Sequence, residues 1–307
     1  MHEIAPDVGY LDLHFQGVPR LIATAVVETE GGVLLVDPGP TTALDALRDG
    51  LLGRGCSLDD VRALLLTHIH LDHAGATGRI VEAHPDVHVY VHERGAPHLA
   101  DPTKLLRSAR RIYGDRLDTL WGDFLAVPEE NITALAGGET IAPGGRTMDV
   151  AYTPGHASHH VSYLDASTGT AFAGDVAGMR VQGADYVLPV APPPDIDVAA
   201  WHASTAALRD WNPDRLMVTH FSAFDDVARH LDALDERLDA MAAAVRATLS
   251  EQEADDDARA ARFHTDQVEA MKAHVPEPLW APYEQFGQPR ESWYGLARYW
   301  QKHRAAD

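Results

Sequence analysis

Residues 67–75 read Thr67-His68-Ile69-His70-Leu71-Asp72-His73-Ala74-Gly75, which places three imidazoles and one carboxylate within six positions. The preceding run 61–66 is short and almost wholly apolar, which is typical of a strand buried on both faces. If the chain stays extended past this strand, the first two histidines project from the same side and can bind one ion. The adjacent Asp72 and His73 need a turn, and a second ion beside the first suits them. Because buried polar side chains are costly without partners, the stretch favours a metal site.

Three later segments, each near the end of an apolar run, carry further candidate ligands. They are Gly155-His156, Gly174-Asp175 and Thr219-His220. The motifs H-x-H-x-D-H, G-H, G-D and T-H, in this order, resemble those of the metallo-β-lactamase superfamily over roughly residues 20–225. This resemblance implies an α/β fold arranged as a four-layer αβ/βα sandwich. The β, α, β order predicted around the first motif agrees with an α/β class.

The resemblance also implies how two metal ions would share the ligands. The expected ligands are His68, His70 and His156 for the first ion, Asp72, His73 and His220 for the second, and Asp175 as a bridge between them. A ligand set of nitrogen and oxygen without thiolate suits two divalent ions. Zinc is the expected metal, and iron or manganese would be tolerated.

Two further positions are expected to support the ligands. In the family, an aspartate at the position of Asp37 stands behind the metal ligands. An equally weighted alternative is that Asp37 only caps the turn before a helix predicted over 41–52. His160 matches a family histidine that lies behind the ligands or faces the substrate, and His159 stands where glycine is commoner, with its role open.

Composition limits the classes of function. The chain has 307 residues, of which 45% are hydrophobic, so it can build a sizeable core. Its net charge of −21 opposes binding to nucleic acid, so we expect a small-molecule substrate. The sequence shows neither a signal-peptide pattern at its start nor a run of 18 apolar residues, which predicts a cytoplasmic protein without a membrane anchor. The single cysteine, Cys56, excludes an intramolecular disulfide.

The chain divides by pattern into a catalytic domain over 1–225 and a helical C-terminal extension over 226–307. Within the first, amphipathic spacing predicts two helices in an insertion over about 97–131, positioned as a lid. In the extension, the acidic run 251–257 predicts a solvated linker or helix end. The aromatic-rich segment 280–300 either packs against the body, forms a homodimer contact or forms a wall of the substrate pocket.

Four residues are candidates for contact with substrate. Arg110 and Arg111 belong to a basic patch on the predicted insertion, which could attract an anionic substrate or simply be a solvated face. Arg180 and Tyr186 follow the expected bridging aspartate and could touch substrate or form structural pairs.

The resemblance implies a hydrolase of thioesters, lactones or related esters, similar to glyoxalase II or the lactonases. Two ions with a hydroxide between them would attack a carbonyl carbon, with Asp72 and Asp175 as the catalytic carboxylates. Glyoxalase II carries a G-R-x-D signature soon after the bridging aspartate, and its absence here argues against a glutathione thioester.

Two alternatives remain open. A persulfide dioxygenase with one iron would use only His68, His156 and Asp175. A metal-holding binding protein would keep the ligand set without turnover. About two zinc ions per chain would favour the hydrolase, and one iron with oxygen uptake would favour the dioxygenase.

Overall fold

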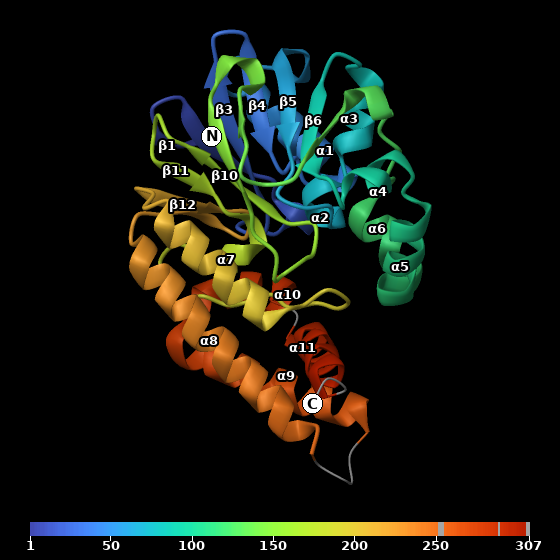
Figure 1. Ribbon diagram of the computed structural model, residues 1–307, viewed down its shortest axis with the longest axis vertical. Coiled ribbons are helices and arrows are strands. Elements are labelled where there is room, and N and C mark those ends of the chain that lie inside the picture. Colours follow the sequence, from blue (N-terminus) through green and yellow to red (C-terminus); the bar gives the residue numbers. More distant parts are fainter. Residues whose placement is uncertain (251–254, 288, 305–307) are drawn as a thin grey trace.

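Two mixed β-sheets form the centre of the molecule (Figure 1). The computed structural model describes residues 1–250, 255–287 and 289–304. In the described part, one sheet holds seven strands in chain order: β1 (His2–Ala5), β2 (Val8–Asp12), β3 (Ala23–Thr29), β4 (Gly32–Val36), β5 (Val61–Leu65), β6 (His88–His92) and β7 (Ile132–Leu135). The other holds six in the order β13-β12-β11-β10-β9-β8: β8 (Thr140–Ile141), β9 (Met148–Tyr152), β10 (Val161–Asp165), β11 (Thr170–Phe172), β12 (Arg215–Val218) and β13 (Ser222–Phe224).

Alternation along the strands separates two cores and creates the layers. In β4, Leu34 and Val36 belong to a core shared with Tyr163 of the other sheet. Their neighbours Val33 and Leu35 belong to the core that contains the helical side chains. Helices α1 (Leu44–Leu52) and α3 (Thr77–Ala83) lie beside the first sheet, and α7 (Val198–Asp210) and α8 (Val227–Thr248) beside the second (Figure 1). The predicted αβ/βα fold class is therefore confirmed.

The segment between β6 and β7 is helical, as predicted, but it holds three α-helices in place of two. These are α4 (Ala96–Ala100), α5 (Thr103–Tyr113) and α6 (Leu117–Trp121). The amphipathic pattern had located α5 and α6. It missed α4, a short helix separated from α5 by Asp101 and Pro102.

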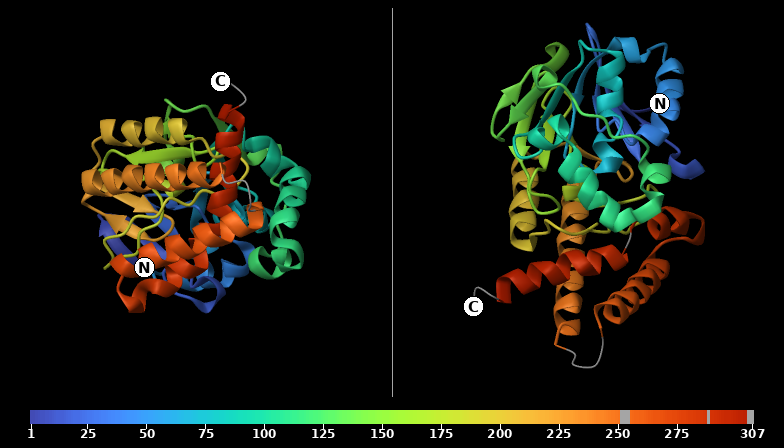
Figure 2. Two further views of the ribbon diagram at one scale, coloured as in Figure 1. Left: turned by 90° about the horizontal axis from the view of Figure 1, so that it is seen from below. Right: turned by 90° about the vertical axis from the view of Figure 1, so that its right-hand side faces the viewer.

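The C-terminal region continues with α9 (Asp256–His274), α10 (Trp280–Phe286) and α11 (Pro289–Arg304). Figure 2 shows these helices at one end of the sandwich, near the insertion helices. The Tyr283 hydroxyl donates to the Tyr186 carbonyl at 2.7 Å, and Ser292 Oγ accepts from the Ala191 amide at 3.1 Å, so the aromatic segment packs against the body. Most of the predicted acidic linker, residues 251–254, lies outside the described residues, and the domain division at residue 225 stays a prediction.

Among the described helices, none combines the length and the apolarity needed to cross a membrane.

Candidate metal centre

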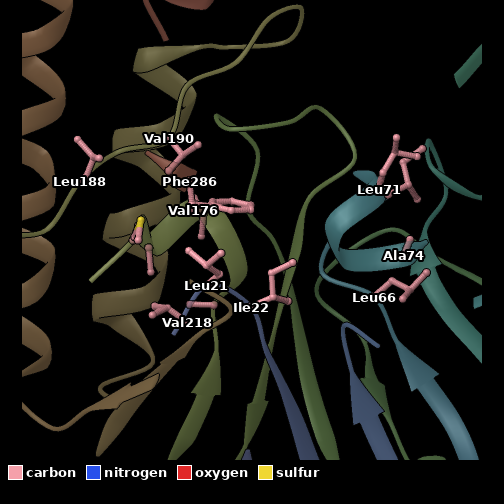
Figure 3. Close-up of a cluster of buried hydrophobic side chains, with 14 of the residues drawn as sticks. Leu21, Ile22, Leu66, Leu71, Ala74, Val176, Leu188, Val190, Val218 and Phe286 are labelled. Atoms are coloured by element: carbon pink, nitrogen blue, oxygen red, sulfur yellow. The ribbon is translucent and has the colours of Figure 1, made fainter. Parts of the chain in front are cut away.

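The candidate ligands gather beyond the ends of four strands. Residues 67–73 follow β5, His156 lies in the loop between β9 and β10, Asp175 follows β11 and His220 follows β12. Apolar side chains surround this region, among them Leu21, Ile22, Leu66, Leu71, Val176, Val190 and Phe286 (Figure 3). Open α/β sheets commonly place binding sites at strand ends, where loops from distant segments converge.

The first ligand group consists of His68, His70 and His156. His70 Nδ1 lies 3.0 Å from His68 Nε2 and 3.0 Å from His156 Nε2. The two histidines of the H-x-H motif therefore meet a third that comes from the opposite sheet.

The second ligand group consists of Asp72, His73 and His220. Asp72 Oδ2 lies 3.5 Å from His73 Nε2 and 3.3 Å from His220 Nε2, and these two nitrogens are 3.2 Å apart. The one-turn helix α2 (Leu71–Ala74) provides the turn that Asp72 and His73 require.

Asp175 lies between the two groups. Its Oδ1 is 3.2 Å from His73 Nε2 and 3.4 Å from His220 Nε2, whereas its Oδ2 is 3.5 Å from His156 Nε2. One carboxylate therefore faces both sets of imidazoles, as a bridging ligand would. The ligand atoms of His68, His73 and Asp175 also lie within 4.8 Å of one another, so His68 is close to both groups.

Hydrogen bonds fix which nitrogen of each ring is free to bind a cation. The Nδ1 atoms of His156 and His220 lie 2.7 Å from the carbonyl oxygens of Val190 and Leu21. Because a carbonyl can only accept, these Nδ1 atoms carry the protons and each Nε2 presents a lone pair to the site. His73 Nδ1 is held in the same way at 2.8 Å from a carboxylate oxygen of Asp37.

The converging nitrogens favour a cation between them. The Nε2 atoms of His73 and His220, 3.2 Å apart, would otherwise repel each other. Asp175 Oδ1 is buried and has no hydrogen-bond partner. A converging set of nitrogen and carboxylate donors with an unsatisfied buried oxygen fits a site for two divalent cations, and it names no particular metal.

The electrostatics of the pocket agree with this interpretation. Burial, together with neighbouring imidazoles, lowers the pKa of His68 well below its usual range and that of His70 to about 4, so both rings are neutral ligands. Burial alone would raise the pKa of the Asp72 and Asp175 carboxyls. Nearby histidines outweigh this effect, so the pKa of both carboxyls is lowered. Burial alone would lower the pKa of His73, but the Asp175 and Asp72 carboxylates outweigh burial and raise this pKa well above its usual value. The carboxylates around His73 therefore favour a positive charge at this position.

Asp37 is fully buried behind the second group and accepts hydrogen bonds from three residues. Its Oδ2 lies 2.8 Å from His73 Nδ1, 2.7 Å from Thr67 Oγ1 and 2.9 Å from Thr219 Oγ1, and its Oδ1 accepts from the Thr67 amide at 2.8 Å. The residue adopts a left-handed conformation with φ of 54°, which turns its side chain toward these donors. Its contacts are those of a ligand support, and no bond from its side chain to the next helix is observed among them.

His160 lies behind the ligands, and His159 faces the cavity. The His160 ring stacks on His68 with centroids 5.1 Å apart, and its Nδ1 is 2.9 Å from Thr153 Oγ1. His159 lines the cavity, where burial and then His70 lower its pKa to about 3. Its imidazole is therefore a neutral part of the cavity wall.

A cavity of about 460 Å³ opens onto His70, Asp72, His156 and Asp175. Its walls come from the insertion helices, from the proline-rich loop 190–195 and from the C-terminal region. Phe286 of α10 stacks on His220 with ring centroids 4.0 Å apart and also lines the cavity. The C-terminal aromatic segment therefore serves as packing and as a pocket wall at once.

The four candidate substrate residues lie outside this cavity lining. Arg180 is buried and forms two hydrogen bonds with Asp226, at 2.7 and 3.0 Å. Tyr186 accepts a hydrogen bond from Arg237 at 3.0 Å. Arg110 is exposed, 3.6 Å from an oxygen of Asp118, and neither it nor Arg111 lines the cavity. Their contacts are those of structural pairs and a solvated face.

Sequence reasoning missed several residues of the cavity wall. Arg94, His98, Glu291 and Ser292 line it, although none stands in a motif. One member of the predicted basic patch, Lys104, does reach the cavity. A pocket wall was one of the three roles expected for the aromatic segment 280–300, and Phe286 within it lines the cavity.

Comparisons with known proteins agree with the observed fold. The model of the family described as "Metallo-beta-lactamase superfamily" matches residues 17–220. The metallo-beta-lactamase fold-containing protein ST1585 of Sulfurisphaera tokodaii is 30% identical over 156 residues, which are 50% of this chain and 58% of that protein. The hydroxyacylglutathione hydrolase of Buchnera aphidicola is 27% identical over 138 residues, 45% of this chain and 40% of that enzyme. The chain thus aligns with less than two thirds of the length of these relatives.

Two solved structures share the architecture over nearly the whole chain. The structure of TTHA1429 from Thermus thermophilus superposes with a TM-score of 0.71 at 19% identity, covering 98% of this chain and 95% of the other. That of the archaeal protein ST1585 gives a TM-score of 0.65 at 22% identity, covering 94% and 97%. At such identities the likeness establishes the fold, helical C-terminal region included.

Proposed function

This chain belongs to the metallo-β-lactamase superfamily, and we propose that it is a two-metal hydrolase that cleaves a thioester, lactone or related ester. Zinc is the metal we expect at both positions. The substrate would be a small molecule, consistent with a cavity of about 460 Å³ beside the ligands. The likeness to a hydroxyacylglutathione hydrolase supports cleavage of an acyl bond.

The observation that carries the proposal is the position of Asp175. Its two oxygens face different ligand groups, at 3.2 Å from His73 Nε2 and 3.5 Å from His156 Nε2. A site for one ion needs only three of these ligands. The convergence of seven, with one carboxylate between two groups, supports a pair of ions, and metal content separates this proposal from a dioxygenase with a single iron.

Two divalent cations in such a site supply an activated water and polarise the substrate carbonyl. The chain supplies the rest. Val190 and Leu21 hold the His156 and His220 rings in the ligand tautomer through their carbonyl groups. Asp72 directs Oδ2 at His73 and His220, which leaves Oδ1 to accept a proton from the attacking water and pass it to the leaving group. Apolar side chains around the centre exclude bulk water.

The test begins with elemental analysis of protein purified without added metal, followed by a panel of thioesters and lactones. We expect about two divalent ions per chain and turnover of at least one class of substrate. One iron per chain with oxygen uptake would establish the dioxygenase instead. Two ions with no turnover of any thioester, lactone or ester would leave the binding protein as the correct description.

A further inference from the structure

The cavity above the metal centre has an apolar wall assembled from distant segments. We define the apolar wall as Leu71, Leu105, Ala109, Ile112, Trp121 and Phe286. Five of the six come from α2, α5 and α6, and Phe286 comes from α10. Ile112 is 38% exposed, and of the described residues only Leu52 is another large hydrophobic side chain with comparable exposure. An apolar ligand in the cavity would cover the side chains of the apolar wall and remove them from water.

The mouth of the same cavity carries cations without carboxylate partners. Arg94 follows β6 and Lys104 lies in the first turn of α5, and both line the cavity. Within the part of the chain that the structure describes, neither has a carboxylate oxygen within 4.0 Å, whereas Arg79 and Arg110 do. The Arg94 guanidinium lies 5.6 Å from the centroid of the Tyr152 ring. On a protein of net charge −21, cations that line a cavity and lack a carboxylate within 4.0 Å favour a negatively charged ligand at that place.

The carboxylates that line the cavity do not lie on the segment that carries Arg94 and Lys104, and one of them already accepts a hydrogen bond. Asp195 of the proline-rich loop accepts a hydrogen bond from Ser158 Oγ at 2.5 Å, and Glu291 is carried by α11. Arg94, His98 and Lys104 instead share the short segment 94–104. The cavity therefore has an apolar side and a cationic mouth.

We propose that the substrate is a thioester whose acyl part is an apolar chain lying on the apolar wall and whose thiol carrier is negatively charged and lies against Arg94 and Lys104. This proposal rests on the proposed hydrolase function and narrows its substrate class. A cavity of about 460 Å³ encloses one chain-sized group and leaves a larger carrier to emerge at the mouth, where the cations lie.

Binding of uncleavable thioethers tests the proposal without requiring turnover. Calorimetry on the metal-loaded protein would compare S-octyl coenzyme A, S-ethyl coenzyme A and S-octyl-N-acetylcysteamine. We expect the octyl chain to bind at least about tenfold tighter than the ethyl chain, because more methylene groups leave water. We expect the anionic carrier to bind about threefold to tenfold tighter than the neutral one, with the difference decreasing as salt is added.

Two substitutions, each with a matched control, test whether the apolar wall binds the acyl chain and whether the cations bind the carrier. I112S should reduce the advantage of the octyl chain by about threefold or more, whereas L52S, at a more exposed hydrophobic residue outside the cavity, should not. K104E should abolish the advantage of the anionic carrier and leave binding of the neutral thioether unchanged, whereas R107E, three residues along α5 and outside the lining, should change neither.

The outcomes separate this proposal from the hydrolase itself. Equal affinities for the three thioethers, or controls that behave like the test variants, would overturn the substrate class even if esters are hydrolysed. Chain-dependent and charge-dependent binding without hydrolysis of octanoyl coenzyme A would support the binding assignment and overturn the hydrolase.

Discussion

The metal centre and the cavity wall are built in opposite ways. The ligands lie shortly after strands and nearly all are buried, and the rings of His73, His156 and His220 are fixed by hydrogen bonds that they donate to Asp37 or to backbone carbonyls. The wall is made of apolar side chains on helices from the insertion and the C-terminal region, and part of it is exposed. This difference indicates that local motifs at the strand ends determine the chemistry. Substrate specificity depends instead on how the insertion helices and the C-terminal helices pack beside the metal centre.

Removal of the bridging carboxylate should produce the largest effect. D175A takes away the group that faces both ligand sets, so we expect loss of about one ion per chain and a fall in kcat/KM on the order of a thousandfold. Elemental analysis and thioester hydrolysis measure both. D210A, at the exposed end of α7, is the control. If D175A retained both ions and full turnover, Asp175 would not bridge two catalytic ions.

Acid should destabilise the protein through a buried histidine that is not a ligand. His230 donates toward the carbonyl of Ala177, and burial lowers its pKa to about 4, with Arg180 adding to the effect and Asp226 opposing it. Between pH 6.5 and 4 the unfolded chain binds a proton that the folded chain does not. The free energy of unfolding therefore falls as the pH falls through this window, by about 3 kcal/mol from this group alone.

Chemical denaturation at several pH values, with H230N beside the natural chain, isolates this contribution. The variant should start less stable near pH 7 and lose less stability on acidification. Parallel curves for the two proteins would show that ligand histidines alone account for the acid sensitivity.

A change behind the ligands should have an intermediate effect. D37N keeps the size of the side chain but weakens the acceptor for His73 Nδ1, 2.8 Å away. We expect metal affinity to fall by about tenfold to a hundredfold. The matched control is D197N, at the aspartate that caps α7 by accepting from the Ala200 amide at 3.0 Å. Competition with a chromophoric chelator measures the affinities, and equal values for D37N and D197N would mean that Asp37 acts only on the fold.

The ligands could be predicted because each follows an apolar strand at a short, fixed spacing. Asp37 could not be decided in the same way, since a helix-capping aspartate and a ligand support share one sequence pattern. Its left-handed φ of 54° and its bond to His73, 36 residues away, appear only in the folded chain. The first two strands, β1 at the edge of the sheet and β2 beside it, were not predicted.

The positions of the expected substrate residues could not be predicted from their neighbours in the sequence. Arg180 and Tyr186 are close to Asp175 in sequence, but their partners Asp226 and Arg237 lie 46 and 51 residues further along. Those long-range pairs turn both side chains away from the cavity. Conversely, Lys104 lines the cavity from the insertion helix α5, and Arg94 lines it from the segment just after β6.

The smallest predicted effect lies at the boundary between the two regions. Phe286 belongs to the wall, yet its ring stacks on the ligand His220 with centroids 4.0 Å apart. His220 is fixed independently by its 2.7 Å bond to the Leu21 carbonyl, so F286L should keep both ions and lower kcat/KM for an octanoyl thioester by only about threefold to tenfold. The matched control is F263L, at a buried phenylalanine of α9 outside the cavity, which should cost similar stability, about 1 kcal/mol, without a kinetic change. Loss of metal in F286L would show that the wall also positions the centre, because the ligand ring then depends on the docked C-terminal helix as well as on its own strand end.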